Sequence, residues 1–385
     1  MKSSFLIFFA IVLTIYGLVN FYIFIRGWHA IPQSSYLRSY YLVIFLVLSL
    51  SYLSGRILER YWMSFLSDAL TWAGSFWLAA MVYFLFLVLL IDILRLINIF
   101  AHFLPENGSA NYSDLKLIVF LFSVLIISLT VSLGYINARN PVINKLELSI
   151  QKKAGHLKEL NIAMVSDIHL GTIIGADRFN SIVEKINELN SDIVLLAGDI
   201  VDEDIQPVIR HNLGETLKNI KSKYGVFGIT GNHEYIGGAD NAIKYLMEHN
   251  VIMLRDTSIK IDNSFYIIGR EDRSKRSFTG VQRKSLEELM AGIDKNLPVL
   301  VMNHQPFEFD EVVQSGADLH LSGHTHHGQL WPFNYITQKI YEISRGYLKK
   351  GNTHFFVSAG AGTWGPPIRL GNRPEIVNIK LKFEE

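Results

Sequence analysis

Carboxylate, amide and imidazole side chains recur in this sequence directly after short apolar runs. The first case is Ala163–Leu170, AMVSDIHL, in which an apolar run ends at Asp167 and His169. Both residues stand where a strand gives way to a loop, so we expect them to reach the same point above a sheet edge. The pattern returns in GDIVD at Gly198–Asp202, GNHE at Gly231–Glu234, NHQP at Asn303–Pro306 and GHTHHG at Gly323–Gly328. Together, these stretches predict five strand ends that deliver metal-binding groups to one edge of a sheet.

The residue types match a site for two divalent cations. Oxygen and imidazole ligands suit hard and borderline cations, and two ions roughly 3.5–4 Å apart form a clamp for phosphoester cleavage. A carboxylate must bridge such ions, and Asp199, at the end of the run IVLLAG, is the natural bridge. The preceding Gly198 allows the backbone to turn sharply as it leaves the strand. Asp167, His169 and one late histidine would complete the first site, and Asn232 with two late histidines the second.

Composition narrows the function classes. The net charge is +1 and Cys is absent. A nucleic-acid surface usually has a basic excess, so we expect no nucleic-acid partner. Without cysteine, disulfides, thiolate zinc sites and thiol nucleophiles are excluded, and any metal must use His, Asp, Glu or Asn.

The hydrophobic excess of the chain lies before Asn140. A bilayer crossing needs roughly 20 mainly apolar residues, and we predict a membrane domain over residues 1–139 followed by a catalytic domain over 140–385. The membrane domain would hold four transmembrane helices at about 5–25, 37–57, 70–98 and 116–136. The second run is the shortest, and an interfacial or re-entrant segment is its alternative. Asp92 and Arg95 stand three apart near the end of the third run, either as a functional intramembrane pair or as an ion pair near the headgroups.

The basic residues between these runs give an expected orientation. Cytoplasmic loops carry an excess of Lys and Arg. If the N-terminus is cytoplasmic, slightly more basic residues lie on the cytoplasmic side than on the outer side. The cytoplasmic set is then Lys2, Arg56, Arg60, Arg139 and Lys145, and the outer set is Arg26, Arg38, Arg95 and Lys116. We therefore expect a multi-pass protein of the bacterial plasma membrane with a cytoplasmic catalytic domain.

From Asn140 onward, short strands alternate with helices. Strands are expected at Val142–Ile150, Leu160–Val165, Ile193–Ala197 and Val226–Thr230, and helices at Asp177–Leu189, Val208–Ile220 and Ala239–Glu248. This βαβ repetition predicts a largely parallel sheet with helices outside. Six later strands have fewer helices between them and would form a second sheet packed on the first: Ile259–Ile261, Phe265–Ile268, Val299–Met302, Leu319–Leu321, His354–Val357 and Ile376–Leu381.

In the order D-x-H, G-D-x-x-D, G-N-H-E/D, H-x-P and G-H-T-H, the motifs resemble those of the calcineurin-like metallophosphoesterases from about Leu160 onward. The resemblance implies an α/β, α+β fold: a β-sandwich flanked by helices. It implies two divalent metal ions (Mn, Fe or Zn), the first held by Asp167, His169, Asp199 and His326, the second by Asp199, Asn232, His304 and His324. It also implies that His233 contacts the phosphate and protonates the leaving oxygen, so that His233 and Asp199 are the catalytic residues.

The block GHTHHGQLWPF and the ending AGTWGPPIRLGNRPEI resemble a subgroup of membrane-tethered bacterial enzymes. The subgroup includes transmembrane proteins with a metallophosphoesterase domain and enzymes that hydrolyse UDP-2,3-diacylglucosamine. This chain departs from it at His327, where glycine is common, and in its longer membrane block.

Several residues near the motifs have two readings. His327 would touch substrate or be a hydrogen-bonded loop residue, and Asp202 and Glu234 would orient a histidine or cap a loop. Arg369 and Arg373 would bind a substrate phosphate or form salt bridges with acids such as Glu375. An apolar rim for an acyl chain, or ordinary core, would be formed by Phe307, Phe309, Leu330, Trp331 and Phe333. A loop that meets anionic lipid, or one that is simply solvated, would be formed by Arg270, Arg273, Lys275 and Arg276.

The sequence thus predicts a membrane-embedded hydrolase with the bilayer and a lipid-linked phosphate substrate as partners. A nucleotide-linked or pyrophosphate lipid is the favoured class. The alternatives are a membrane-anchored phosphoesterase for soluble substrates and a non-enzymatic metal-binding membrane protein.

Overall fold

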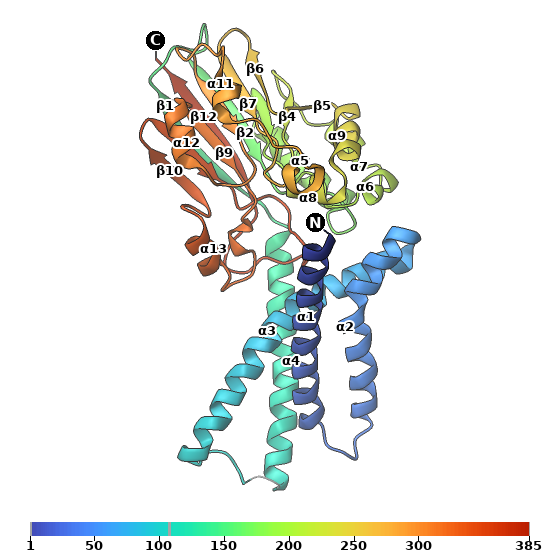
Figure 1. Cartoon of the computed structure of the whole chain (residues 1–385). Helices are drawn as coiled ribbons and strands as arrows, with labels where there is room; N and C mark the ends of the chain where they lie inside the picture. The colour runs from blue at the N-terminus through green and yellow to red at the C-terminus, as the bar shows by residue number, and fades with distance from the viewer. Residues whose placement is uncertain (1, 107–108, 385) are drawn as a thin grey trace. The chain divides into compact units, whose positions relative to one another are not determined.

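The computed structural model describes residues 2–106 and 109–384 (Figure 1). Their contacts divide the chain into two compact units. One contains the chain up to Tyr135 together with Gly365–Ile368, and the other contains Ile136–Trp364 with Arg369 to the C-terminal end.

The first unit is built from four long helices, as predicted. They are α1 (Lys2–Ala30), α2 (Leu37–Tyr61), α3 (Phe65–Ala101) and α4 (Ala110–Ala138). All four are long and apolar enough to cross a membrane. The second run is a continuous helix of 25 residues, which corresponds to about 37 Å and exceeds the roughly 30 Å bilayer core, so a re-entrant segment is not needed.

Aromatic residues hold these helices together. Ile23 of α1, Phe45 of α2 and Trp77 of α3 form the buried centre. The indole of Trp77 donates to Asn20 Oδ1 at 2.9 Å, which satisfies a polar atom that would be costly to bury alone.

The capping box of Ser64 and Ser67 begins α3, and His102 ends it in the left-handed conformation.

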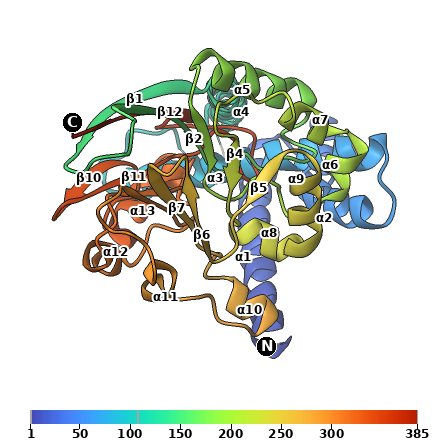
Figure 2. The ribbon, with the colours of Figure 1, turned by 90° about the horizontal axis from the view of Figure 1, so that it is seen from above.

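The second unit contains two sheets, as predicted, and each has six strands (Figure 2). The first has the order β1-β12-β2-β3-β4-β5, with β12 antiparallel to β2 and the other pairs parallel. Its strands are β1 (Val142–Ile150), β12 (Glu375–Phe383), β2 (Glu159–Val165), β3 (Ile193–Leu196), β4 (Val226–Gly228) and β5 (Val251–Met253). The placement of one strand was wrong: Ile376–Leu381, expected in the second sheet, belongs to β12 and lies in the first sheet between β1 and β2.

The second sheet has the order β10-β11-β9-β8-β7-β6 and is antiparallel only at its two outer pairs. Its strands are β10 (Gly346–Lys350), β11 (Thr353–Val357), β9 (Leu319–Ser322), β8 (Val299–Met302), β7 (Phe265–Gly269) and β6 (Thr257–Ile261).

Alternating side chains make this unit a four-layer structure. Ala163 and Val165 of β2 face one core, whereas Ile162 and Met164 face the core between the sheets, as the period of two in a strand requires. The helices on the first sheet are α5 (Ala176–Glu188), α6 (Gln206–Arg210), α7 (Leu213–Leu217) and α9 (Ala239–Glu248). On the second sheet lie α11 (Leu286–Met290) and α12 (Phe309–Ser315).

The remaining helices are short and lie in loops: α8 (Asn232–Gly237), α10 (Lys275–Thr279), the 3₁₀ turn η1 (His326–Gly328) and α13 (Asn334–Ile340). One helix prediction was wrong. The stretch 208–220, expected as one helix, is broken into α6 and α7 because Asn212 adopts a left-handed conformation with φ of 51°.

Candidate metal centre

The loops that follow β2, β3, β4, β8 and β9 bring the predicted ligands together at the carboxyl ends of these strands. The backbone N–H groups of Asp167 and His169 donate to the carbonyls of Gly198 and Asp199 at 3.0 Å, which ties the first two loops to each other. Gly198 has φ of +88°, and a Cβ there would lie 2.6 Å from the His304 ring. Only glycine combines this conformation with such close packing.

Most of the candidate ligands have an unusual backbone. Asp167, His169, Asp199, His324 and His326 have φ values between 46° and 73°. Asp and His visit this region more often than most residues, but five cases around one point are not random scatter, since such conformations gather at functional sites.

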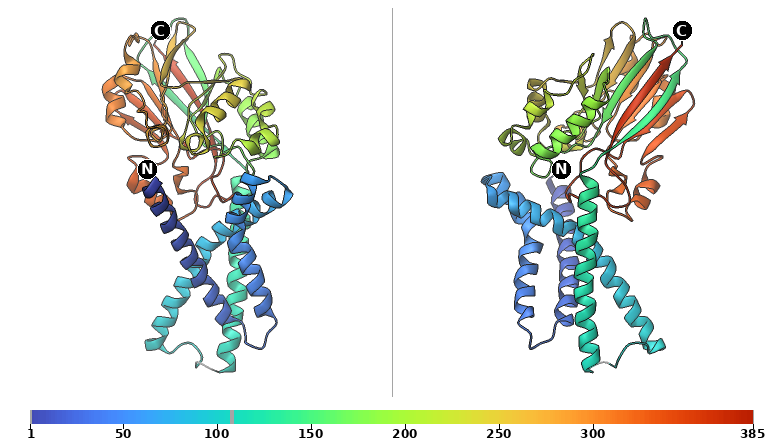
Figure 3. Two further views of the ribbon diagram at one scale, coloured as in Figure 1. Left: turned by 45° about the vertical axis from the view of Figure 1, so that its right-hand side comes forward. Right: turned by 180° about the vertical axis from the view of Figure 1, so that it is seen from behind.

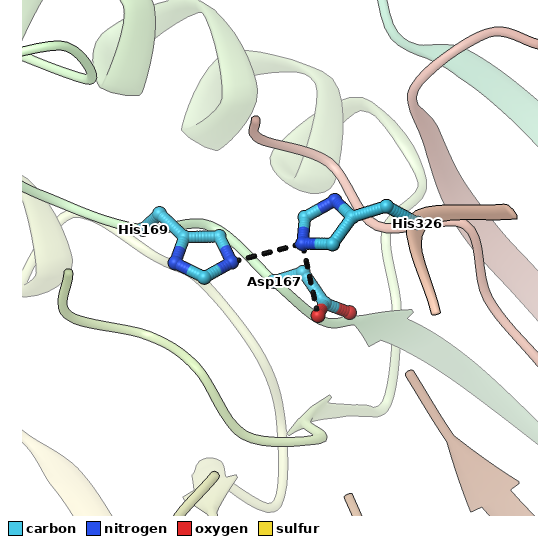
Figure 4. Close-up of side chains that lie close together, drawn as sticks. All are labelled: Asp167, His169 and His326. Carbon is cyan, nitrogen blue, oxygen red and sulfur yellow. Dashed lines mark hydrogen bonds and ion pairs between the residues drawn. The ribbon is translucent and has the colours of Figure 1, made fainter. Parts of the chain in front are cut away.

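One cluster consists of Asp167, His169 and His326 (Figure 4). The two histidines face each other with 3.0 Å between their Nε2 atoms, and His326 Nε2 lies 3.5 Å from Asp167 Oδ1. Burial, together with the nearby His169 and Arg369, holds the pKa of His326 well below its usual value. A neutral imidazole is the form that binds a metal.

A second cluster consists of Asp199, His304 and His324. Asp199 Oδ2 lies 3.0 Å from His304 Nε2 and 3.8 Å from His169 Nε2, so this carboxylate stands between the two clusters. Burial alone would raise the pKa of Asp199, but His304 and His233 outweigh it and hold the pKa well below its usual range. Asp199 is therefore ionised.

The polar atoms of the site fit divalent cations. His304 Nδ1 lies 2.8 Å from the Ala197 carbonyl, an arrangement that fixes the ring and leaves Nε2 to bind a metal. Among the residues that the structure describes, Asn232 Oδ1 is buried without a hydrogen-bond partner. Buried polar atoms normally have partners, and a cation at this position would supply one.

His233 adjoins both clusters and is held by carboxylates. Its Nδ1 lies 3.1 Å from Asp202 Oδ1, and its backbone N–H donates to Asp199 Oδ1 at 2.9 Å. Burial lowers the pKa of His233, but Asp199 and Asp202 outweigh it, and the pKa rises to about 9.

The arrangement of these side chains agrees with what the chain is similar to. The family model for the calcineurin-like phosphoesterases matches residues 160–328. An uncharacterized metallophosphoesterase of Campylobacter jejuni is 30% identical over 98% of this chain and 99% of its own length. The chain belongs to the calcineurin-like phosphoesterase family.

Members of this family are metal-dependent phosphoester hydrolases, and this chain is an integral membrane member with His and Asp clusters suited to divalent metals. An uncharacterized metallophosphoesterase of Helicobacter pylori is 34% identical over 58% of this chain and 60% of its own length. A transmembrane protein with metallophosphoesterase domain from Bos taurus is 29% identical over 68% of this chain and 62% of its own length. The chain thus spans about 60% of the length of these two relatives.

Arg369 differs from its predicted role. The sequence suggested a substrate contact, but the side chain has 0% exposure. Its guanidinium donates to the carbonyls of Ala359 at 2.6 Å and Gly362 at 2.7 Å and to His326 Nδ1 at 3.1 Å. Burial lowers the pKa of Arg369 to about 10, so it remains a cation at neutral pH. Arg369 therefore contacts the His326 ring and the surrounding carbonyls instead of facing the solvent.

Arg373 lies on the surface and donates to the Asn140 carbonyl at 3.2 Å. Its predicted substrate contact stays a prediction. Glu375, proposed as a partner for these arginines, instead binds Arg345 at 2.8 Å.

The open alternatives for three polar residues are resolved by their contacts. Asp202 orients His233 and also lies 3.6 Å from His169 Nδ1. Glu234 caps loops, because it accepts from the backbone N–H groups of Gly231 and Val201 at 2.7 and 2.9 Å. His327 is a hydrogen-bonded loop residue, with Nδ1 at 2.9 Å from Ser344 Oγ.

The basic loop is mostly neutralised. Arg270 is buried and lies 3.1 Å from Glu311, Arg273 lies 3.8 Å from Glu308, and Lys275 lies 3.2 Å from Asp256. Of the two readings of this loop, a free basic surface for anionic lipid is not supported for these three residues, because carboxylates already balance their charge.

Aromatic residues that sequence reasoning missed flank the centre. The exposed Trp364 ring lies 5.7 Å from the His233 ring, and Gln329 holds the Trp364 backbone through two hydrogen bonds of 2.9 and 3.0 Å. Tyr341 lies 6.2 Å from His324 and 4.9 Å from Phe307. Only the position of Trp364 within the ending AGTWGPP hinted at a role. Of the suggested apolar rim, Phe309 is core and Trp331 is exposed.

Proposed function

We propose that this protein is a membrane-embedded phosphoesterase that uses two divalent ions (Mn, Fe or Zn) to hydrolyse a phosphodiester or pyrophosphate bond in a lipid-linked substrate. The observation that carries the proposal is the convergence of imidazole and carboxylate side chains from five strand ends around Asp199. A UDP-2,3-diacylglucosamine-like or pyrophosphate lipid is the favoured substrate.

The two clusters, together with the family resemblance, support two ion positions. Asp167, His169, Asp199 and His326 would hold the first ion, and Asp199, Asn232, His304 and His324 the second. When bound, such a pair of ions supplies Lewis-acid activation of the phosphoryl group and neutralises the charge that develops in the transition state.

His233 would protonate the leaving oxygen. Asp202 lies 3.1 Å from Nδ1, which fixes the ring and leaves Nε2 to carry the transferable proton. Asp199 accepts the His233 backbone N–H at 2.9 Å, so the acid and the ligand shared by both ions move as one piece. The Trp364 ring lies 5.7 Å from the His233 ring.

An apolar surface beside the centre supports the lipid-linked class. Tyr341, next to His324, caps the C-terminal end of α13. The neighbouring surface is half-exposed and apolar, with Trp331, Tyr335, Ile336 and Ile340 between 52% and 58% exposed. Grouped large apolar side chains on a surface mark an interaction site, and an acyl chain fits one next to a phosphate-binding centre.

The test compares two substrates. Full-length protein in detergent with Mn²⁺ would be assayed on an aryl phosphodiester and on a UDP-linked diacyl lipid in mixed micelles. We expect kcat/KM to favour the lipid by at least about tenfold, since binding a few methylenes at ~0.8 kcal/mol each provides that difference. Ile336→Gln with Ile340→Gln should remove the preference and leave aryl hydrolysis unchanged.

Ile209→Gln is the matched control, because Ile209 is an exposed isoleucine on α6. Equal turnover of both substrates by the unmodified protein would indicate a phosphoesterase for soluble substrates. Failure to hydrolyse either, with metal bound, would indicate a non-enzymatic metal-binding protein.

We also propose a bacterial plasma membrane location with a cytoplasmic catalytic domain, on the basis of the basic residues between the helices. Because the chain has no cysteine, the exposed position 151 can carry a single reporter as Gln151→Cys. Membrane-impermeant maleimide should label it only after the cells are permeabilised. Labelling in intact cells would reverse the orientation.

A further inference from the structure

The four-helix unit contains a charged cluster between α1 and α3. Asp92 Oδ2 lies 2.6 Å from the Arg26 guanidinium and accepts from the Tyr22 hydroxyl at 2.5 Å. Arg95 reaches the other carboxylate oxygen at 3.5 Å. Two guanidinium groups therefore share one carboxylate, and Arg26 Nε is a buried donor without a hydrogen-bond partner among the described residues.

This cluster stands where two cavities meet. A polar one of about 710 Å³ includes Asn98, His102 and Glu106 in its lining. An apolar one of about 980 Å³ is lined by all four helices, with Phe45, Trp77 and Phe120 among its walls. The lining residues common to both are Arg26, Asp92, Arg95, Leu104 and Tyr112.

The helices are packed unevenly along α3. Figure 3 shows the last turns of α3 diverging from α4, while the aromatic contact of Trp77 with Phe45 holds α2 and α3 together nearer the start of α3. The charged residues Asp92 and Arg95 lie toward the other end of α3, within Phe65–Ala101.

We propose that these joined cavities bind an anionic membrane lipid, with its phosphate at Arg26 and Arg95 and its acyl chains in the apolar cavity. The lining holds three cations, Arg26, Arg95 and Lys116, against Asp92 and the exposed Glu106. A purely structural ion pair needs one cation for Asp92. The second guanidinium and the unpartnered Nε are donors that fit phosphate oxygens, which arginine binds in pairs.

The shape of the site agrees with this ligand. A volume of about 980 Å³ is at the upper end of the ~300–1,000 Å³ typical of small-molecule sites, and its lining is mostly aliphatic and aromatic. Lys116, which donates to the His29 carbonyl at 3.3 Å, adds a basic group on the α4 side. The site lies wholly among residues 23–132 and does not depend on the metal centre.

Lipid titrations followed by native mass spectrometry test the proposal on the full-length protein in detergent. Phosphatidylglycerol and phosphatidylcholine with identical chains would be compared. We expect one phosphatidylglycerol to bind at least about tenfold more tightly, and Arg26→Gln with Arg95→Gln to remove this preference, since a hydrogen bond to a charged group is worth ~1.5–3 kcal/mol. Arg26→Lys with Arg95→Lys should retain part of it.

Two variants separate charge from general disturbance of the helices. Arg38→Gln removes a cation that stacks on Trp28 at 4.9 Å and should leave lipid binding unchanged. Ala80→Phe fills the apolar cavity that Ala80 lines and should weaken binding of both lipids. Brominated phosphatidylglycerol should quench the tryptophan fluorescence of the wild type more than that of the Trp77→Phe variant, because Trp77 lines the cavity.

Equal affinity for the two lipids, or lipid binding unaffected by both the double glutamine variant and Ala80→Phe, would overturn the proposal. Retention of no lipid by the unmodified protein would do the same.

Discussion

The metal centre and the charged cluster of the four-helix unit differ in how the backbone presents their charged residues. At the metal centre, the side chains come from loops after five strands, and five of them sit on residues with positive φ. In the four-helix unit, Asp92 and Arg95 are three apart on one helix, and Asp92 meets Arg26 of another. The first arrangement is rigid and specified by strand ends, whereas the second relies on long side chains reaching across a helix pair.

The two sites also differ in their charge balance. At the metal centre, Asn232 Oδ1 is a buried acceptor without a hydrogen-bond partner among the described residues, which fits a cation. At the charged cluster of the helix unit, the buried atom without a partner among the described residues is a donor, Arg26 Nε. It lies beside two guanidinium groups that share one carboxylate, which fits an anion. The sign of the unpartnered groups therefore indicates the sign of the ligand, because a buried polar atom without a partner is costly.

Removing the shared carboxylate of the metal centre should have the largest effect. Asp199→Ala deletes the oxygen that stands between His304 and His169, so we expect loss of metal and a fall in kcat/KM of roughly 10³-fold or more, since metal ions supply several kcal/mol at 1.36 kcal/mol per tenfold. Phosphoesterase assays with metal analysis of the purified protein measure both. Normal activity with full metal content would show that Asp199 is not a ligand.

His233→Ala should slow catalysis while metal stays bound. Loss of a general acid costs about 10²–10⁴-fold, and His233 adjoins the ligand clusters without completing either of them. His327→Ala is the matched control, since His327 binds the Ser344 hydroxyl in a loop. If both variants kept wild-type turnover, the proton-donor role of His233 would be wrong.

These two predictions concern residues whose proximity could be read from the sequence. Each motif follows an apolar strand, and the parallel order β2-β3-β4 aligns three of those strand ends at one edge. The four membrane helices and both sheets were likewise predictable, because hydrophobic length and period carry that information. The strands β5 and β10 were missed, since one has three residues and the other, Gly346–Lys350, alternates without a buried face.

What lies around the ligands could not be predicted. Nothing in RLGNRP separates Arg369 from Arg373, yet one is fully buried against carbonyls and the other is exposed. The approach of Trp364 to His233 spans 131 positions in the chain and depends on the fold of the C-terminal loop. Periodicity reports which face of a strand is buried, but it does not report which long-range partner a polar side chain meets.

Replacing the buried arginine tests whether positioning matters at the metal centre. Lysine at position 369 keeps the charge but not the planar fork that reaches His326 Nδ1 and the Ala359 and Gly362 carbonyls. We expect Arg369→Lys to lower metal affinity by about 10–100-fold, as for other groups that hold a ligand in place, with activity recovered at high Mn²⁺.

Arg373→Lys is the companion variant, and its metal affinity should stay within about twofold of that of the wild type, since surface contacts contribute ~0–1 kcal/mol. An equal loss of metal affinity in both variants would mean that position 369 acts through the general stability of the protein. The same conclusion would hold if excess Mn²⁺ did not restore the activity of the Arg369→Lys variant.

The smallest expected effect sharpens the comparison most directly, because it removes a carboxylate from the other site. In Asp92→Asn the neutral amide no longer balances Arg26 and Arg95. An anionic lipid would then no longer compete with the Asp92 carboxylate for the two arginines. We therefore expect the affinity for phosphatidylglycerol to rise roughly two- to fivefold, within the ~1 kcal/mol that a partly exposed ion pair contributes. Loss of a carboxylate thus weakens ligand binding at the metal centre and strengthens it between the helices. Native mass spectrometry of the full-length variant measures the change, and weaker phosphatidylglycerol binding would mean that Asp92 instead holds the two arginines in the binding geometry.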